Sequence, residues 1–124
     1  MKLVILYIIP MNKDNIFQLI EQQIKSNDIV LYMKGTIHAP KCGFSAIVAN
    51  IIQELTKDFK NINCTYIDVL CDDDLRQGIK EYTDWPTIPQ LYIQEEFIGG
   101  CDIVKEMYRN GELKALLLQK FKDN

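Results

Sequence analysis

Short apolar runs that alternate with helical periodicity constrain the fold of this chain more than any other feature. Residues 28–33 and 64–69 are compact apolar runs with the length of buried strands. Between them, residues 43–57 repeat apolar side chains every three or four positions, as an amphipathic helix does. A strand, a helix and a second strand in this order predict a unit in which the two strands run parallel.

The rest of the chain extends this unit into an α/β fold. We expect a first helix from Asn12, its N-cap, to about residue 27, and a third helix beginning at the acidic residues 72–74. Residues 90–94 and 97–98 predict a hairpin. A fourth helix, capped by Asp102, and a last helix after Gly111 follow. The order predicts a small mixed four-stranded sheet flanked by helices on both faces, in one domain over residues 12–124.

The same periodicity predicts which helical side chains face the core. The predicted core-facing residues are Ile16, Leu19, Ile20 and Ile24 in the first helix, Phe44, Ile47, Val48, Ile51, Ile52 and Leu55 in the second, Leu75, Ile79 and Tyr82 in the third, and Leu113, Leu116, Leu117 and Phe121 in the last.

Charge and hydropathy exclude two classes of partner. The 124 residues carry a net charge of −3, with no basic stripe to neutralise phosphates, so we expect no nucleic-acid binding. The apolar run 3–9 is far shorter than the roughly 20 residues that span a bilayer, so we expect no membrane insertion. We interpret residues 1–11 as an N-terminal extension, either an extra strand or a loosely packed segment, with a remnant of a targeting segment as the alternative.

The four cysteines, at positions 42, 64, 71 and 101, contain no pair separated by two residues. This spacing excludes a zinc finger and a dithiol redox pair, and it favours a reducing compartment with mostly structural thiols. We expect Cys64 and Cys71 to be structural. The single histidine, His38, is predicted to be an ordinary loop residue.

Cys42 is the exception because it directly precedes the second helix. The unpaired backbone N–H groups of residues 43–45 are expected to point toward its sulfur. A helix N-terminus stabilises a negative charge by up to ~2 kcal/mol, and Lys34 and Lys41 add positive charge nearby. The thiolate that results is a nucleophile or a metal ligand at neutral pH. Ser45, one helical turn on, cannot form a disulfide, so the partner is a small thiol, another protein or a metal.

Four motifs in order resemble the monothiol glutaredoxins of the CGFS class, in the thioredoxin-like superfamily. They are Lys-Gly-Thr at 34–36, Cys-Gly-Phe-Ser at 42–45, Trp-Pro-Thr-Ile-Pro-Gln-Leu-Tyr at 85–92 and Gly-Gly-Cys-Asp at 99–102. The resemblance covers roughly residues 14–120 and implies a thioredoxin-like fold with a glutathione site. Ile37 departs from the family pattern, which has proline after Lys-Gly-Thr.

The resemblance also implies how glutathione is held. Lys34, Arg76 and Lys80 would face its carboxylates. A cis-proline turn at Ile88–Pro89 would pair with its peptide backbone, and the N–H groups of Cys101 and Asp102 would receive the γ-glutamyl carboxylate. The complete set of implied site residues is Lys34, Cys42, Phe44, Arg76, Lys80, Thr87, Ile88, Pro89, Gly100, Cys101 and Asp102.

Three roles stay open at this point. Trp85 either forms a wall of the site or packs in the core. Cys101 is either a resolving thiol for Cys42 or a small buried residue. Asp102 can pair with the glutathione ammonium, and its role as a helix cap is compatible with that contact.

Two functions compete on this basis. A [2Fe–2S] cluster takes four thiolates, and one chain offers one activated cysteine, so two protomers and two glutathiones complete the set. The leading hypothesis is a homodimer, bridged by the cluster through Cys42, that transfers the cluster to iron–sulfur acceptor proteins in the cytoplasm or the mitochondrion. The alternative is glutathione-dependent thiol–disulfide exchange that removes glutathione from proteins. A redox sensor or protein-interaction module is a third possibility.

Overall fold

Four strands form one mixed sheet in the computed structural model, which describes residues 12–121. The order across the sheet is β2-β1-β3-β4. The strands are β1 (Ile29–Met33), β2 (Cys64–Asp68), β3 (Gln90–Ile93) and β4 (Glu96–Gly99). β1 pairs parallel with β2 and antiparallel with β3, and β3 pairs antiparallel with β4. The predicted mixed sheet is therefore confirmed, whereas the expectations for residues 1–11 lie outside the described residues.

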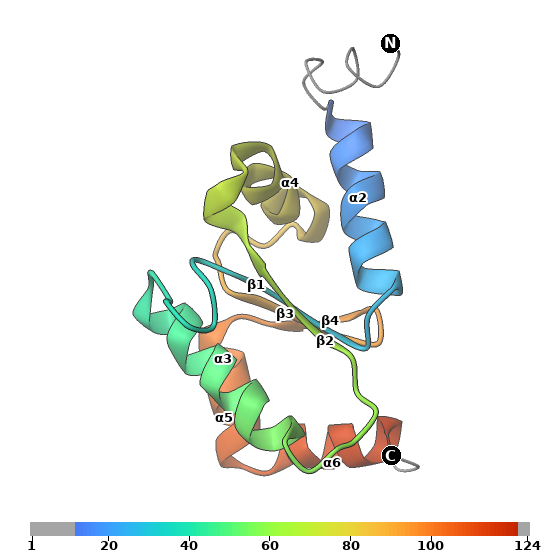
Figure 1. The fold of residues 1–124 in the computed structure, drawn as a ribbon, viewed down its shortest axis with the longest axis vertical. Coiled ribbons are helices and arrows are strands. Elements are labelled where there is room, and N and C mark those ends of the chain that lie inside the picture. The colour runs from blue at the N-terminus through green and yellow to red at the C-terminus, as the bar shows by residue number, and fades with distance from the viewer. Residues whose placement is uncertain (1–11, 122–124) are drawn as a thin grey trace.

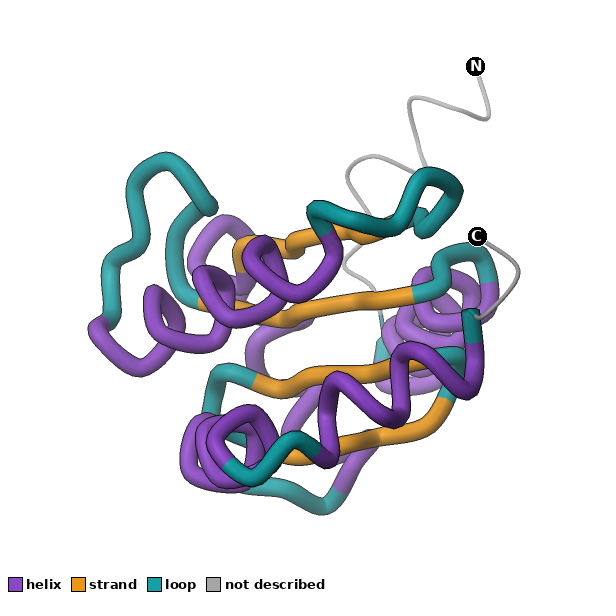
Figure 2. Tube along the Cα trace, turned by 90° about the horizontal axis from the view of Figure 1, so that it is seen from below, coloured by secondary structure: helices purple, strands orange, loops and turns teal. Residues whose placement is uncertain are grey.

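Helices cover both faces of this sheet, as the sequence predicted. α2 and α4 lie on one face, and α3, α5 and α6 lie on the other (Figure 1). Seen from below, the strands lie side by side, with helices on the near face of the sheet in front of them (Figure 2). The helices are α2 (Lys13–Lys25), α3 (Gly43–Thr56), α4 (Asp73–Thr83), α5 (Cys101–Arg109) and α6 (Glu112–Lys120), with a 3-10 turn η1 (Val69–Cys71) after β2. Within residues 12–121, no helix has the length and apolar character needed to cross a membrane.

The sheet separates two apolar clusters, and β1 contributes to both. Ile29, Leu31 and Met33 join the cluster under α3, α5 and α6, while Val30 and Tyr32 join the cluster under α2 and α4. All five residues of β1 are buried, which confirms the prediction of a strand buried on both faces. β1 lies between β2 and β3 in the sheet, and the loop that follows it leads to Cys42.

Side chains cap the N-termini of two helices, and a third helix has no side-chain cap. The side chain of Asn12 accepts a hydrogen bond from the backbone N–H of Asn15, as predicted, and Asp72 caps α4 in the same manner. Asp102 does not cap α5, which corrects the prediction. Gly100 is the N-cap, so the helix begins two residues earlier than predicted and Asp102 lies in its first turn. A carboxylate in that turn is still favoured by the helix dipole.

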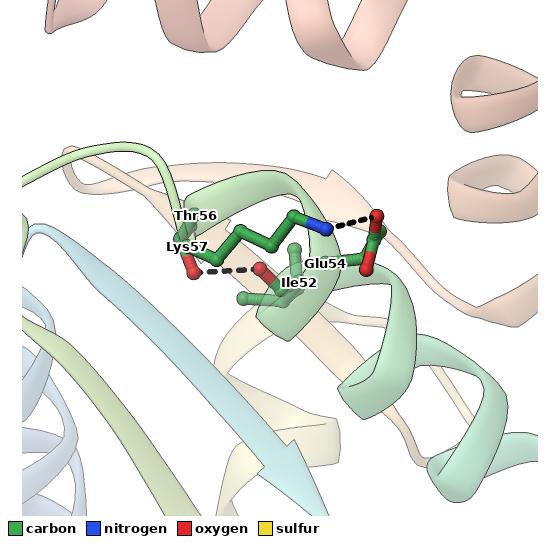
Figure 3. Close-up of polar contacts among 4 residues, drawn as sticks. All are labelled: Ile52, Glu54, Thr56 and Lys57. Atoms are coloured by element: carbon green, nitrogen blue, oxygen red, sulfur yellow. Dashed lines mark hydrogen bonds and ion pairs between the residues drawn. The ribbon is translucent and has the colours of Figure 1, made fainter.

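Two local polar contacts lie at the C-terminal end of α3, the end away from Cys42. The hydroxyl of Thr56 donates to the carbonyl oxygen of Ile52 at 2.7 Å, and Lys57 pairs with Glu54 at 2.8 Å (Figure 3). The hydroxyl bond is a second bond to a carbonyl that already accepts from the helix backbone, which is a common arrangement for threonine in a helix. The exposed ion pair contributes little to stability. α3 ends at Thr56, close to the predicted boundary.

Three aromatic or aliphatic side chains predicted to face the core are exposed instead. Phe44 is 62% exposed, and Ile47 and Tyr82 are each 37% exposed. In α3 the buried face keeps Val48, Ile51 and Ile52 but also includes Ser45 and the small Ala49, which leaves Phe44 and Ile47 at its edge. The other residues predicted to face the core are buried or half-buried.

Close contact between α2 and α4 accounts for the position of Tyr82 at the surface. A Cβ atom on Gly78 would clash with Cγ2 of Ile16, so the missing side chain lets the two helices approach closely. The ring of Tyr82 packs edge-on against Phe17 at 5.4 Å, on the outer side of this contact.

Candidate functional site

Cys42 occupies the N-cap position of α3. Its backbone is extended, and its side chain makes no capping hydrogen bond. The pKa of the thiol is lowered, chiefly by the backbone N–H of Ser45; burial opposes this, and the N–H of Phe44, the hydroxyl of Ser45 and the charge of Lys34 add to it. This agrees with the prediction that helix amides stabilise the thiolate, although Lys34 rather than Lys41 is the lysine that acts on it.

Ser45 connects the thiol to the loop that follows β1. It is fully buried, and its hydroxyl oxygen accepts a hydrogen bond of 3.0 Å from the backbone N–H of Lys34. The same hydroxyl also lowers the pKa of Cys42. Ser45 therefore holds Lys34 beside the sulfur, in addition to leaving Cys42 without a thiol partner one turn along the helix.

Asp68, at the end of β2, holds the same loop from the other side. One of its carboxylate oxygens accepts hydrogen bonds of 2.9 Å from the backbone N–H groups of Gly35 and Leu70, and the other accepts from the Cys71 thiol at 3.3 Å. Burial opposes ionisation, but these bonds outweigh it and lower the pKa of Asp68. Sequence analysis missed Asp68, although an acidic residue at the end of an apolar strand is a usable signal.

A cavity of about 320 Å³ opens beside the first turn of α3. It lies between the turn before β3 and the first residues of α5. Seven of the predicted site residues line it, together with Trp85 and Ile103. These seven are Phe44, Thr87, Ile88, Pro89, Gly100, Cys101 and Asp102. Trp85 thus belongs to a wall of the cavity, and its ring also packs edge-on against the half-buried Phe97 at 5.5 Å.

The turn before β3 contains the predicted cis peptide bond between Ile88 and Pro89. Ile88 is buried, yet within residues 12–121 no hydrogen bond joins its backbone N–H or carbonyl to another group. Buried backbone groups are nearly always paired in native proteins. The polar groups of Ile88 are therefore available to an extended peptide bound in the cavity.

The first turn of α5 forms the opposite side of the cavity. The N–H groups of Cys101 and Asp102 lie in the first turn, where a helix provides no backbone acceptor. The N-cap residue, Gly100, has no side chain that could accept a hydrogen bond from them. A Cβ atom at Gly100 would lie 3.2 Å from the indole nitrogen of Trp85 and 3.3 Å from the carbonyl oxygen of Pro89. Glycine at this position keeps the space between the turn and the helix open.

Four predicted site residues do not line the cavity: Cys42 and the cations Lys34, Arg76 and Lys80. Lys34 lies near the thiol, as its effect on the pKa of Cys42 indicates. Arg76 and Lys80 lie four residues apart on α4, half-buried, and neither forms an ion pair with another of the described residues. Their positive charges therefore remain available, but the structure does not bring them to the wall of the cavity.

The other cysteines have environments that differ from that of Cys42. Burial raises the pKa of Cys101, and the nearby charges of Asp102 and Cys42 add to this. Burial likewise raises the pKa of Cys64. Cys71 is exposed, and its hydrogen bond to Asp68 raises its pKa. Cys42 is thus the one cysteine with a lowered thiol pKa, and Cys101 is half-buried in the cavity wall rather than fully buried.

Comparison with known proteins agrees with this geometry. The family model described as Glutaredoxin matches residues 29–98, which include the Cys42 motif and the cis-proline turn. The chain belongs to the glutaredoxin family. It is 50% identical over 103 residues to a probable monothiol glutaredoxin 2 of Rickettsia typhi, covering 83% of this chain and 88% of that protein. It is 48% identical over 100 residues to a mitochondrial monothiol glutaredoxin-5 of Lachancea kluyveri, and the match covers 81% of this chain and 68% of that protein.

The fold agrees with that of solved glutaredoxins. A crystal structure of a buckwheat glutaredoxin–glutathione complex superposes with a TM-score of 0.73 at 24% identity, covering 89% of this chain and 96% of that one. The predicted thioredoxin-like fold is therefore confirmed. The single cysteine of the Cys42 motif places the chain among the monothiol glutaredoxins.

Proposed function

We propose that this monothiol glutaredoxin binds a [2Fe–2S] cluster between two protomers, with Cys42 and glutathione as ligands, and passes the cluster to acceptor proteins. One observation carries the proposal. The Cys42 thiol has a lowered pKa and a hydroxyl rather than a thiol one helical turn away, and Phe44, in the same first turn of α3, lines a cavity of about 320 Å³. Such a sulfur is a strong ligand that needs an external thiolate to complete a metal site.

The residues around the cavity fit glutathione chemically. The unpaired backbone groups of Ile88 suit the peptide of a short extended ligand. The free N–H groups at the start of α5 suit the γ-glutamyl carboxylate, and Asp102 in the same turn suits its ammonium group. The cations Lys34, Arg76 and Lys80 suit the second carboxylate. Bound glutathione would supply a second thiolate next to Cys42.

The ligand count supports a dimer. Among residues 12–121, no three histidine, cysteine, aspartate or glutamate side chains are grouped so that they could hold a metal ion. A [2Fe–2S] cluster takes four ligands, so with Cys42 and one glutathione each protomer supplies two. Two protomers complete the set.

Anaerobic reconstitution tests the proposal. The reduced protein is mixed with ferric iron, sulfide and glutathione, and the visible spectrum and the mass in solution are recorded together. We expect sulfur-to-iron absorption and a dimeric mass, both of which are lost when glutathione is omitted or Cys42 is replaced by serine. Cys71→Ser is the matched control because Cys71 is exposed and is not part of the cavity. Absorption that survives Cys42→Ser contradicts the proposal.

The lowered pKa of Cys42 favours thiol–disulfide exchange as the second candidate function. The Cys42 thiolate would attack the glutathione sulfur of a mixed disulfide, forming a Cys42–glutathione disulfide and releasing the protein thiolate. A second glutathione thiolate would then release oxidised glutathione and restore Cys42. A glutathione-coupled reductase assay separates the two functions. High turnover on a glutathionylated protein, with no cluster formed on reconstitution, would favour the enzyme.

The free thiols fit a reducing compartment, and we assign the protein to the cytoplasm or the mitochondrion on that ground. The Lachancea relative is named as mitochondrial. Microscopy of the fluorescently tagged full chain distinguishes the two compartments in a eukaryotic host.

A further inference from the structure

Gln90 is a buried polar residue that the proposed function does not use. It begins β3, directly after the cis-proline turn, and is fully buried. Its side-chain nitrogen donates to the carbonyl oxygens of Trp85 and Thr87, at 3.1 and 3.2 Å. Its side-chain oxygen accepts from the hydroxyl groups of Thr83 and Tyr92, at 3.1 and 3.3 Å. A buried amide with all of these partners is a fixed element of the structure.

The chemistry of these partners determines which way the Gln90 amide points. Trp85 and Thr87 present backbone carbonyls, which only accept hydrogen bonds. If the amide were turned over, its oxygen would face two other oxygens. The Gln90 NH₂ group must therefore face the turn, where it connects the two carbonyls to the start of the sheet.

This connection sets the direction of the neighbouring Ile88 N–H. The peptide bond between Thr87 and Ile88 is trans, since the cis bond is the one after Ile88. In a trans peptide the C=O and N–H groups point in opposite directions. Because Gln90 holds the Thr87 carbonyl, the Ile88 N–H points away from the buried amide, and this N–H is without a partner in the described part of the chain.

We infer that Gln90 is a positioning residue for glutathione, acting through the Thr87–Ile88 peptide. The inference rests on the proposed glutathione site. Gln90 itself does not line the cavity, whereas Thr87 and Ile88 do. Its hydrogen bonds also do not reach the groups that lower the pKa of Cys42, which are Ser45, Phe44 and Lys34. Gln90 therefore affects the affinity for glutathione without changing the acidity of the thiol.

Substitution separates these two effects. Gln90→Met has similar length and cannot donate to either carbonyl. Binding is measured by calorimetry with S-methylglutathione, whose blocked sulfur prevents disulfide exchange, and the pKa of Cys42 is measured from the pH dependence of its alkylation. We expect at least a tenfold weaker affinity in Gln90→Met, an unchanged Cys42 pKa, and no change in the control Gln53→Met, because Gln53 is exposed on α3.

A second variant provides a graded test. In Gln90→Glu the protonated carboxyl group can donate one hydrogen bond to the turn, whereas the carboxylate can donate none. We expect its affinity for S-methylglutathione to weaken, relative to the unmodified protein, as the pH rises and this carboxyl ionises. A purely structural role in folding would not produce this pH dependence in a variant that stays folded.

The unmodified protein gives a test that needs no substitution. On titration with S-methylglutathione, the amide signal of Ile88 is expected to shift and its hydrogen exchange to slow. An unchanged Ile88 amide at saturation, or unchanged affinity in folded Gln90→Met, would overturn the inference while leaving the proposed function in place. No binding of S-methylglutathione by the unmodified protein would overturn both.

Discussion

The hydroxyl of Ser45 lies between Lys34 and Cys42, accepting a hydrogen bond of 3.0 Å from the backbone of the first and lowering the thiol pKa of the second. A serine in this position is thus part of the apparatus that activates the thiol. It also keeps the loop after β1 attached to the start of α3.

Replacing Ser45 by alanine is expected to raise the pKa of Cys42 and to lower stability by about 1 kcal/mol, because the Lys34 N–H loses its acceptor. The pH dependence of Cys42 alkylation measures the first effect and urea unfolding the second. Ser26→Ala, at the exposed C-cap of α2, is the control. An unchanged alkylation profile would show that the hydroxyl has no part in activation.

The four cysteines are expected to react in a defined order as the pH rises. The Cys42 pKa is lowered, whereas those of Cys64, Cys71 and Cys101 are raised, so Cys42 forms its thiolate at the lowest pH. Pulsed alkylation followed by mass spectrometry of each peptide measures this order. Cys71 is the informative comparison because it is more exposed than Cys42, and faster labelling of Cys71 near neutral pH would contradict the prediction.

Removing the Asp68 carboxylate is expected to destabilise the protein by about 2 kcal/mol, because the N–H groups of Gly35 and Leu70 lose their acceptor. Asp68→Asn keeps one acceptor oxygen and should retain much of this stability, whereas Asp68→Ala should not. The folded-state pKa is lowered, so the contribution of the carboxylate is present above the unfolded-state pKa and is lost as the pH falls through the folded-state value.

Urea unfolding of Asp68→Ala and the unmodified protein across acidic pH measures this effect. The difference in unfolding free energy is expected to shrink as the solution becomes more acidic. A constant difference would mean that the carboxylate charge is not involved.

Gly78→Ala is expected to destabilise the protein, although alanine favours helix formation by up to about 1 kcal/mol over glycine. The added methyl group would clash with Cγ2 of Ile16, and overpacking of this kind costs about 1–3 kcal/mol. Thermal unfolding should show a lower midpoint. Ile16→Leu removes the clashing methyl group, so the two changes together should cost less than their sum.

Gly43→Ala is the matched control for this helix prediction, because a Cβ atom there meets nothing within 4 Å. It should be neutral or slightly stabilising. Equal losses at Gly43 and Gly78 would point to backbone effects rather than to the contact with Ile16.

Gly100→Ala is expected to weaken S-methylglutathione binding about tenfold while leaving the pKa of Cys42 unchanged. The new Cβ atom would occupy the space between the Trp85 indole and the Pro89 carbonyl, where the turn and α5 border the cavity. Calorimetry measures the affinity, and far-UV circular dichroism verifies the fold. Full affinity in a folded variant would show that this part of the cavity is not used.

The sequence predicted the elements of the fold well because their signals are local. The apolar run of β1, the Asn12 cap and the Ile88–Pro89 turn are each encoded within a few residues. The orientation of α3 was less well predicted. Phe44 and Ile47 are apolar but exposed, because packing against the sheet buries Ser45 and Ala49 instead, and hydrophobic periodicity gives such small or polar residues little weight.

The supporting contacts of the site could not be predicted for a different reason. Asp68 binds the N–H of Gly35, 33 residues away, and Gln90 connects groups that become neighbours only when the turn before β3 has formed. Such contacts depend on the tertiary arrangement and leave no periodic pattern in the sequence. Of the site residues carried over from family motifs, those around the turn before β3 and the start of α5 line the cavity, whereas Cys42, Lys34, Arg76 and Lys80 do not.

The reactivity of Cys42 is largely a property of the main chain, since the strongest influence on its sulfur is the amide of Ser45. Exchanging side chains nearby therefore tunes the reactivity of this sulfur without abolishing it. The free amides of a first helical turn face whichever residue stands at the N-cap, so moving the cysteine away from that position, rather than altering its neighbours, is the change that removes this activation.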